Sequence, residues 1–203
     1  MSTLSFSPDL LLARRAAGGR AEAWEELLAL YGDRVFNLAV HFTGSVVDAE
    51  DLAQEIFLRL YQNLRSYRGD VPLAAWALRL SRNVCIDHYR RTRREHRAAT
   101  LSDEVLAHLP AEDDPQAEAQ KRQQLRAVYR GLEEMSEDLA EVVLLRDLQG
   151  WTMEETAAVL EVPVGTVKSR LHRARLELAG RVTSLLGARG PALAVPALEV
   201  EPC

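Results

Sequence analysis

Residues 152–175 read TMEETAAVLEVPVGTVKSRLHRAR, a pattern typical of two short helices joined by a tight turn. Thr152 and Glu155 have the spacing of a capping box, which predicts the start of the first helix. Pro163 cannot continue a helix, so a turn is expected just before it. A second helix then opens at Gly165. Residues at helical spacing predict its apolar side, namely Val167, Leu171 and Ala174.

The opposite side of the second helix is basic and rich in hydrogen-bonding groups. It carries Lys168, Ser169, Arg170, His172 and Arg173. A helix with one apolar and one cationic side fits the major groove of DNA, and the small residue Ala157 suits the close crossing of two such helices. An ordinary amphipathic hairpin with a solvated basic side has the same spacing, so periodicity alone does not separate the two interpretations.

The net charge of −5 hides a strongly polarised chain. Residues 79–97 hold seven arginines and two acids, and residues 168–181 hold five cations and one acid. Between them, residues 98–120 hold six acids and neither Lys nor Arg, as expected of a linker. Two basic segments on either side of an acidic one are compatible with a nucleic-acid partner despite the net charge.

Apolar residues at helical spacing predict further helices in the first half of the chain. One ends at Gly44, and Ser45 can cap the next. Another is expected to start near Asp70 and Pro72, since proline is tolerated in a first helical turn. The composition therefore predicts an all-helical protein.

The two cysteines, Cys85 and Cys203, form no recognisable disulfide framework and indicate a reduced compartment. Cys85 falls in a predicted helix, where a small core residue is expected. The sequence has neither a signal-peptide pattern nor a run long enough to cross a membrane. These features predict a cytoplasmic protein.

Three segments resemble the ECF (extracytoplasmic function) sigma factors of bacterial RNA polymerase. PVGTVKSRLHRAR, residues 163–175, is similar to the helix-turn-helix of region four in that family. DAEDLAQEIFLRL, residues 48–60, resembles region 2.2, and residues 65–94 resemble regions 2.3 and 2.4. The likeness extends over about residues 21–182. The family usually has Gly where Glu161 stands, so we expect Glu161 to adopt the turn backbone itself, at positive φ.

The resemblance implies an all-α fold of two small helical domains joined by an acidic flexible linker. The expected segments are a loose N-terminal lead-in (1–20) with a short helix near residues 10–16, a sigma-two domain (21–97), the linker (98–120), a sigma-four domain (121–182) and a C-terminal tail (183–203). The family also implies that this chain is not an enzyme and needs no metal or cofactor. The polymerase core performs the chemistry, and the sigma factor selects and opens the promoter.

The resemblance assigns three sets of residues; without it, the charged and polar residues of the front domain would be interpreted as solvated helix surface. Duplex DNA at the minus-thirty-five element would contact Gly165, Thr166, Lys168, Ser169, Arg170, His172 and Arg173. The melted strand of the minus-ten element would contact Tyr67, Arg68, Asn83, Asp87, Arg90, Arg91 and Arg94. The clamp helices of the largest subunit of core RNA polymerase would contact Asp48, Asp51, Gln54, Glu55 and Phe57. The family also implies an anti-sigma factor as a further partner.

The sequence also bears on two other classes of protein. A stand-alone regulator of the LuxR type also ends in a helix-turn-helix, but it would carry an N-terminal sensor or receiver domain with strands. An enzyme is disfavoured because the five histidines are scattered and no phosphate-binding loop or nucleophile elbow is present. Cys85 and His88 form a lone pair without further ligands, so a zinc site is not expected.

Overall fold

A computed structural model describes residues 8–92 and 115–187, and the described chain is helical with no strand. The front domain contains α1 (Pro8–Ala17), α2 (Ala21–Thr43), α3 (Val46–Asn63), the 3-10 turn η1 (Leu64–Ser66) and α4 (Leu73–Thr92). The rear domain contains α6 (Pro115–Glu133), α7 (Glu137–Val143), the π-helical segment η2 (Leu144–Leu148), α8 (Met153–Leu160) and α9 (Val164–Leu186). Within the described residues, no helix is both long and apolar enough to cross a membrane.

The core of the front domain is a bundle of α2, α3 and α4. Its largest buried side chains include Leu38, Leu52, Ile56 and Leu78, each at most 2% exposed. The predicted boundary between α2 and α3 is confirmed, since Gly44 adopts the left-handed conformation (φ 67°) and the Ser45 side chain accepts a hydrogen bond from the amide of Asp48. Cys85 is fully buried, as expected.

Helix α1 covers residues 8–17 and so includes the short helix expected near residues 10–16. Helix α1 buries Leu12, Ala13 and Ala16 in a second apolar cluster at the end of the bundle. Asp9 accepts a hydrogen bond from the backbone amide of Leu73 at 2.8 Å, so the first turn of α4 is capped from another helix. Because α4 begins at Leu73, the helix start expected near Asp70 and Pro72 was slightly early.

Both ends of the rear domain extend beyond the predicted limits. Helix α6 begins at Pro115, inside the segment predicted as linker, with proline at a position where it is tolerated. Helix α9 continues to Leu186. Gly131 allows α6 and α9 to approach closely, because a Cβ there would lie 2.8 Å from Cδ1 of Leu178. The remaining linker and tail positions lie outside the described residues.

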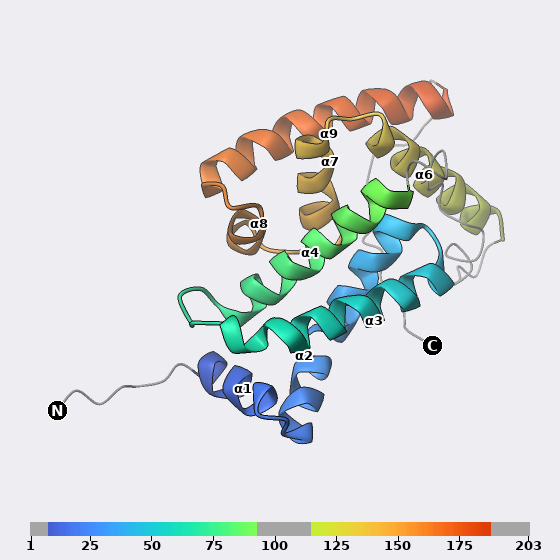
Figure 1. Cartoon of the computed structure of the whole chain (residues 1–203). Coiled ribbons are helices and arrows are strands. Elements are labelled where there is room, and N and C mark those ends of the chain that lie inside the picture. Colours follow the sequence, from blue (N-terminus) through green and yellow to red (C-terminus); the bar gives the residue numbers. More distant parts are fainter. Residues whose placement is uncertain (1–7, 93–114, 188–203) are drawn as a thin grey trace.

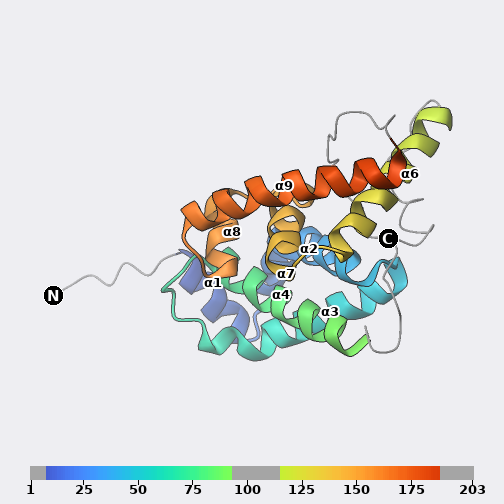
Figure 2. The same cartoon turned by 90° about the horizontal axis from the view of Figure 1, so that it is seen from above.

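The two domains pack against each other rather than standing apart. Helices α7 and α8 lie between α9 and α4 in both views (Figures 1 and 2). Apolar residues of both domains join one continuous core, in which Trp151 is 1% exposed. From α2, the Arg34 guanidinium lies 4.9 Å from the centre of the Trp151 ring and donates to Glu155 at 2.9 Å. The rear domain is thus held over one side of the front domain.

Candidate nucleic-acid interface

A groove of about 320 Å³ lies on the front domain between α3, η1 and α4. Its lining residues are Arg59, Asn63, Ser66, Trp76, Arg79, Leu80, Asn83, Val84 and Asp87. Asn83 and Asp87 are exposed, and the same groove is lined by Ser66, which directly precedes the predicted contacts Tyr67 and Arg68. Amide, carboxylate and guanidinium groups beside an indole ring can hydrogen-bond to the edges of an unstacked base.

Of the groove residues, only Asn83 and Asp87 were among the predicted contacts, and Arg59 and Asn63 are two that were not. They recur with Ser66 at a spacing of four and three residues along α3 and η1, which places them on one side. That spacing was a usable signal. From the sequence alone this spacing did not predict a DNA contact, because neither residue belongs to a run of charged residues.

Tyr67 differs from its predicted role. Its side chain is 7% exposed, its ring centre lies 5.6 Å from that of Trp76, and its hydroxyl donates to the carbonyl of Val71 at 2.7 Å. Burial in the apolar cluster with Leu73 raises the pKa of this phenol. Tyr67 therefore holds the loop in place rather than offering its ring to a base, whereas the neighbouring Arg68 is exposed.

The basic end of α4 is partly engaged in ion pairs. Arg90 lies 3.2 Å from Glu137 of α7, and Arg91 lies 3.7 Å from Glu55 of α3. Glu55 also accepts a hydrogen bond from Arg59 at 2.6 Å. Arg94 lies outside the described residues.

The helix-turn-helix forms as its sequence predicts. Thr152 and Glu155 complete a reciprocal capping box, with bonds of 2.9 and 3.0 Å. Glu161 adopts the left-handed conformation (φ 56°, ψ 39°), and its amide donates to the carbonyl of Ala157. Helix α9 begins at Val164, one residue before the predicted start. Burial alone would raise the pKa of Glu155, but hydrogen bonds from Arg34 and Thr152 bring it below its ordinary value.

Replacing Glu161 by glycine is expected to raise the free energy of unfolding by about 1 kcal/mol, because a left-handed residue with a side chain is strained. The ion pair that is lost with Arg79 is largely exposed, so its contribution is small. Urea denaturation of wild type, Glu161→Gly and Glu161→Gln measures the effect, since the glutamine variant loses the pair but keeps the strain. A glycine variant no more stable than the glutamine variant would contradict this account.

The outward side of α9 presents most of the predicted duplex contacts. Gly165, Lys168, Ser169, His172 and Arg173 are exposed, and Thr166 is half-buried. The Ser169 hydroxyl donates to the carbonyl of Thr166 at 3.0 Å.

Two arginines at the edges of α9 are turned toward other helices. Arg170, predicted to contact DNA, lies 2.6 Å from Asp138 of α7. Arg175 donates to both carboxylate oxygens of Asp147 at 2.7 and 2.5 Å, which raises the pKa of its guanidinium. The Arg175 pair was not predicted, because its partner lies 28 residues away in sequence. These ion pairs fix the orientation of α9 on the rear domain. The exposed residues between them, such as Lys168, Ser169 and His172, therefore face outward.

Helix α3 presents a mixed apolar and polar stripe on its outer side. At spacings of three and four residues it carries Val47, Asp51, Gln54, Leu58 and Tyr61. Val47 is 58% exposed, Leu58 62% and Tyr61 49%, which is unusual for large apolar side chains clustered on one helix. Asp48 is exposed at one edge of the stripe. At the other edge Phe57 is half-buried, its ring centre 6.3 Å from that of Trp24.

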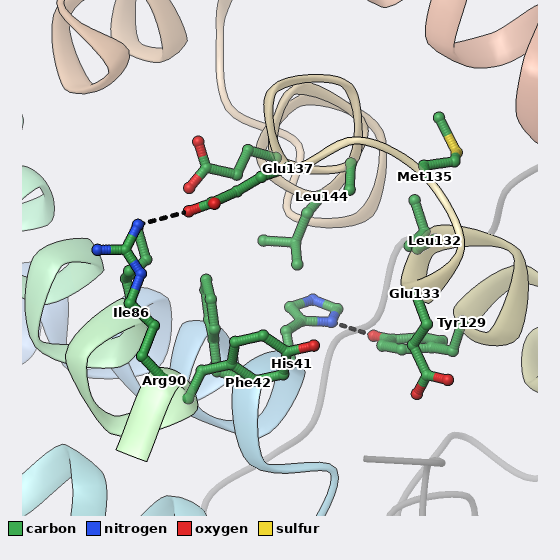
Figure 3. Close-up of a pocket in the computed structure, with 13 residues that line it drawn as sticks. His41, Phe42, Ile86, Arg90, Tyr129, Leu132, Glu133, Met135, Glu137 and Leu144 are labelled. Atoms are coloured by element: carbon green, nitrogen blue, oxygen red, sulfur yellow. Dashed lines mark hydrogen bonds and ion pairs between the residues drawn. The ribbon is translucent and has the colours of Figure 1, made fainter. Parts of the chain in front are cut away.

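A second cavity, of about 240 Å³, lies between the two domains (Figure 3). It is bordered by His41 and Phe42 of α2, Arg90 of α4, Tyr129 of α6 and Glu137 of α7, among others. The His41 ring stacks on that of Tyr129, whose hydroxyl is hydrogen-bonded to Nδ1, while Nε2 is buried without a hydrogen-bond partner. Burial lowers the pKa of His41 to about 3, so the ring is neutral at pH 7.

Acidification is expected to destabilise the chain through His41. Because the folded pKa of about 3 lies below the ordinary value of 6.5, the unfolded state binds more protons between these values. Stability is therefore fully present above pH 6.5 and falls as the pH drops toward 3, by about 2 kcal/mol at pH 5. Urea denaturation at pH 7 and pH 5 should show this loss of stability in wild type. In His41→Asn the difference in unfolding free energy between the two pH values should be smaller by about 2 kcal/mol. An identical pH dependence in both proteins would contradict the assignment.

Comparisons with known proteins give a consistent result. Residues 27–95 match the family described as Sigma-70 region 2, and residues 125–178 match Sigma-70, region 4. RNA polymerase sigma-H factor of Pseudomonas aeruginosa is 30% identical over 178 residues, which cover 85% of this chain and 92% of that protein. The ECF RNA polymerase sigma-E factor of Escherichia coli is 30% identical over 88% of this chain and 96% of its own length. ECF RNA polymerase sigma factor SigE of Mycolicibacterium smegmatis is 34% identical over 157 residues, and the chain spans 60% of its length.

Solved structures show the same fold. CnrH, in complex with the cytosolic domain of CnrY, superposes with a TM-score of 0.63 at 27% identity, covering 91% of this chain and all of that one. The sigma factor RpoE from Bartonella quintana, in complex with the anti-sigma factor NepR, gives a TM-score of 0.56 at 22% identity, with coverage of 84% and 100%. The two domains and their order define a transcription initiation factor of the sigma-70 type. Within that class, the chain belongs to the ECF sigma factors.

Proposed function

We propose that this chain binds core RNA polymerase through α3, contacts duplex promoter DNA through α9, and holds an opened strand in the groove beside α4. The observation that carries the proposal is the pair of separate surfaces suited to two forms of DNA. One is a narrow basic helix side, and the other is a groove with hydrogen-bonding groups beside an aromatic ring. We propose that the chain acts in the cytoplasm and that it catalyses no reaction itself.

At the upstream element, α9 would enter the major groove with its outward side. Lys168 and Arg173 lie on opposite edges of that side, so they can reach base edges or the phosphates of the two strands. The exposed Gly165 lies in the first turn of α9, where backbone amides favour a phosphate. Thr166, Ser169 and His172 complete the contact, and Arg170 would reach a phosphate by leaving Asp138.

At the downstream element, an unstacked base would enter the groove between η1 and α4. Asn83 can donate to and accept from a base edge, and Asp87 can accept from an exocyclic amine. Arg68, Arg90, Arg91 and Arg94 would bind the strand's phosphates. The volume of about 320 Å³ and the mixed polar and aromatic lining support this assignment.

The stripe on α3 would bind the polymerase clamp helices. Exposed Val47 and Leu58 supply the apolar centre, and Asp48, Asp51 and Gln54 supply a polar and acidic surround. Glu55 and Phe57 lie at the edges of this surface, Glu55 already paired with two arginines. The predicted set from the sequence included the acidic residues and Phe57 but not Val47 and Leu58. An anti-sigma factor is a further proposed partner.

Reconstituted transcription tests the proposal. Purified chain is added to core polymerase, and run-off transcripts are mapped on a library of genomic fragments from the same organism. We expect discrete start sites that share an upstream sequence element and that disappear without the chain. A chain that copurifies with polymerase but yields no added start site would contradict the proposed function.

A further inference from the structure

The cavity between the two domains is large enough to hold a small molecule. Its volume is about 240 Å³, and its walls come from α2, α4, α6, α7 and η2 (Figure 3). Well-packed protein interiors contain few voids larger than a water molecule, and an apolar cavity of about 150 Å³ already admits benzene. Three exposed side chains lie along its border, namely Arg90, Glu133 and Glu137, so the cavity opens to solvent there.

The buried part of the lining is apolar except for one pair of polar rings. Its residues are each at most 9% exposed, namely His41, Ile86, Tyr129, Leu132 and Met135. Nε2 of His41 is buried there without a hydrogen-bond partner. Figure 3 shows this nitrogen on the side of the ring away from Tyr129, facing the space beside Leu144. Because a buried polar atom without a partner is costly, a ligand atom that pairs with Nε2 gains affinity.

The contact with Tyr129 determines which kind of ligand atom can pair with Nε2. Within the described residues, the hydroxyl of Tyr129 is hydrogen-bonded to Nδ1 of His41 and to no other side chain. If the phenol donates to Nδ1, Nε2 carries the ring proton and is the one group left unpaired. If Nδ1 carried the proton instead, the phenol proton and Nε2 would both lack a partner. The first arrangement costs less, so Nε2–H is a donor and the ligand must supply an acceptor.

Charge along the border disfavours an anionic ligand. Three lining residues are acidic and one is basic. Arg90 lies 3.2 Å from Glu137, and both carboxylate oxygens of Glu141 accept from Arg82 at 2.6 Å. Carboxylates therefore outnumber the guanidiniums that neutralise them. Burial also keeps the His41 ring neutral, with its pKa lowered to about 3, so it offers no positive charge to an anion at pH 7.

We propose that this cavity is a binding site for a small uncharged ring compound that carries a carbonyl oxygen. The ring would pack against Ile86, Leu132 and Met135, and the carbonyl oxygen would accept a hydrogen bond from Nε2 of His41. An ordered water is a poor alternative, because it needs about two to four polar partners. Since the walls belong to both domains, the bound molecule also stabilises the folded chain by mass action. The inference goes beyond the proposed contacts with DNA and polymerase and does not depend on them.

The test uses three probes that have the same number of heavy atoms. Acetophenone carries the carbonyl, isopropylbenzene has a methyl group in place of the carbonyl oxygen, and benzoate carries a negative charge. Each is titrated into the full-length chain at pH 7, and the methyl resonances of Leu132 and Met135 are followed by NMR. We expect acetophenone to bind with a Kd of about 1 mM or lower. It should bind about tenfold more tightly than either of the other probes, because only it satisfies Nε2–H without adding charge. Absence of acetophenone binding, or equal affinity for acetophenone and isopropylbenzene, would overturn the inference.

Two variants establish that the cavity and its histidine are responsible. His41→Phe with Tyr129→Phe removes both polar groups together and keeps both rings, so no buried group is left unpaired. Its preference for acetophenone over isopropylbenzene should disappear. Ala140→Phe places a ring in the cavity and should abolish binding of both probes, whereas Ala21→Phe, at an exposed position of α2 outside the cavity, should leave binding unchanged. A preference that persists in the double variant, or probe binding that survives in a folded Ala140→Phe chain, refutes the assignment.

Discussion

Replacing Leu58 by aspartate should lower the affinity for core RNA polymerase by about a hundredfold. Leu58 is 62% exposed at the centre of the α3 stripe, so the substitution leaves the front domain folded. A few central contacts of an interface contribute about 2 kcal/mol or more each, and burying a carboxylate at such a position adds a desolvation penalty. Binding of labelled chain to immobilised core polymerase measures the effect.

A matched variant makes this prediction specific to α3. Leu30→Asp introduces the same charge at a leucine of α2 that is 53% exposed, and it should bind polymerase as wild type does. Charge reversal by Asp51→Arg, two turns from Leu58 on the stripe, should also weaken assembly. If both leucine variants bind equally well, the docking surface lies elsewhere on the chain.

Replacing Arg173 by alanine should weaken binding to the upstream duplex by about 1–3 kcal/mol, or roughly tenfold to a hundredfold, while leaving attachment to polymerase intact. The guanidinium is exposed on the outward side of α9, and its Nε donates only to a backbone carbonyl of the same helix, at 3.4 Å. The side chain is therefore available to DNA. Binding of reconstituted holoenzyme to a duplex with the upstream element, compared with one in which that element is scrambled, gives the measurement.

The control for Arg173 is Arg20→Ala, which removes an exposed positive charge before α2. This variant should bind both duplexes only slightly more weakly than wild type, because one long-range electrostatic attraction is lost. An Arg173→Ala holoenzyme that discriminates between the duplexes as wild type does, or one that no longer assembles, would show that α9 has another role.

Local chemistry explains why much of the fold could be predicted. The capping box at Thr152, the proline before α9 and the glycine after α2 act within a few residues, so sequence spacing is sufficient to place them. The positive φ of Glu161 was expected for a different reason, since the family that the chain resembles usually has Gly at this position of the turn. In the site, the periodicity of α9 placed the basic side outward because the apolar residues had to face the domain.

Contacts between distant segments could not be read in the same way. The capping of α4 by Asp9, the burial of Tyr67 and the pairing of Arg175 with Asp147 depend on where helices meet, which spacing does not encode. The packing of the rear domain on α4 belongs to the same class. Its carboxylates are scattered among many acids, and only the assembled chain brings them to the arginines.

Permanganate reactivity of promoter thymines tests the central claim most directly, because it reports strand opening at single-base resolution. At a start site mapped with this chain, holoenzyme should make thymines about ten base pairs upstream reactive, and Asn83→Ala with Asp87→Ala should suppress this while the upstream duplex stays bound. If those thymines remain unreactive with the wild-type holoenzyme bound, the chain does not open DNA and the account is wrong.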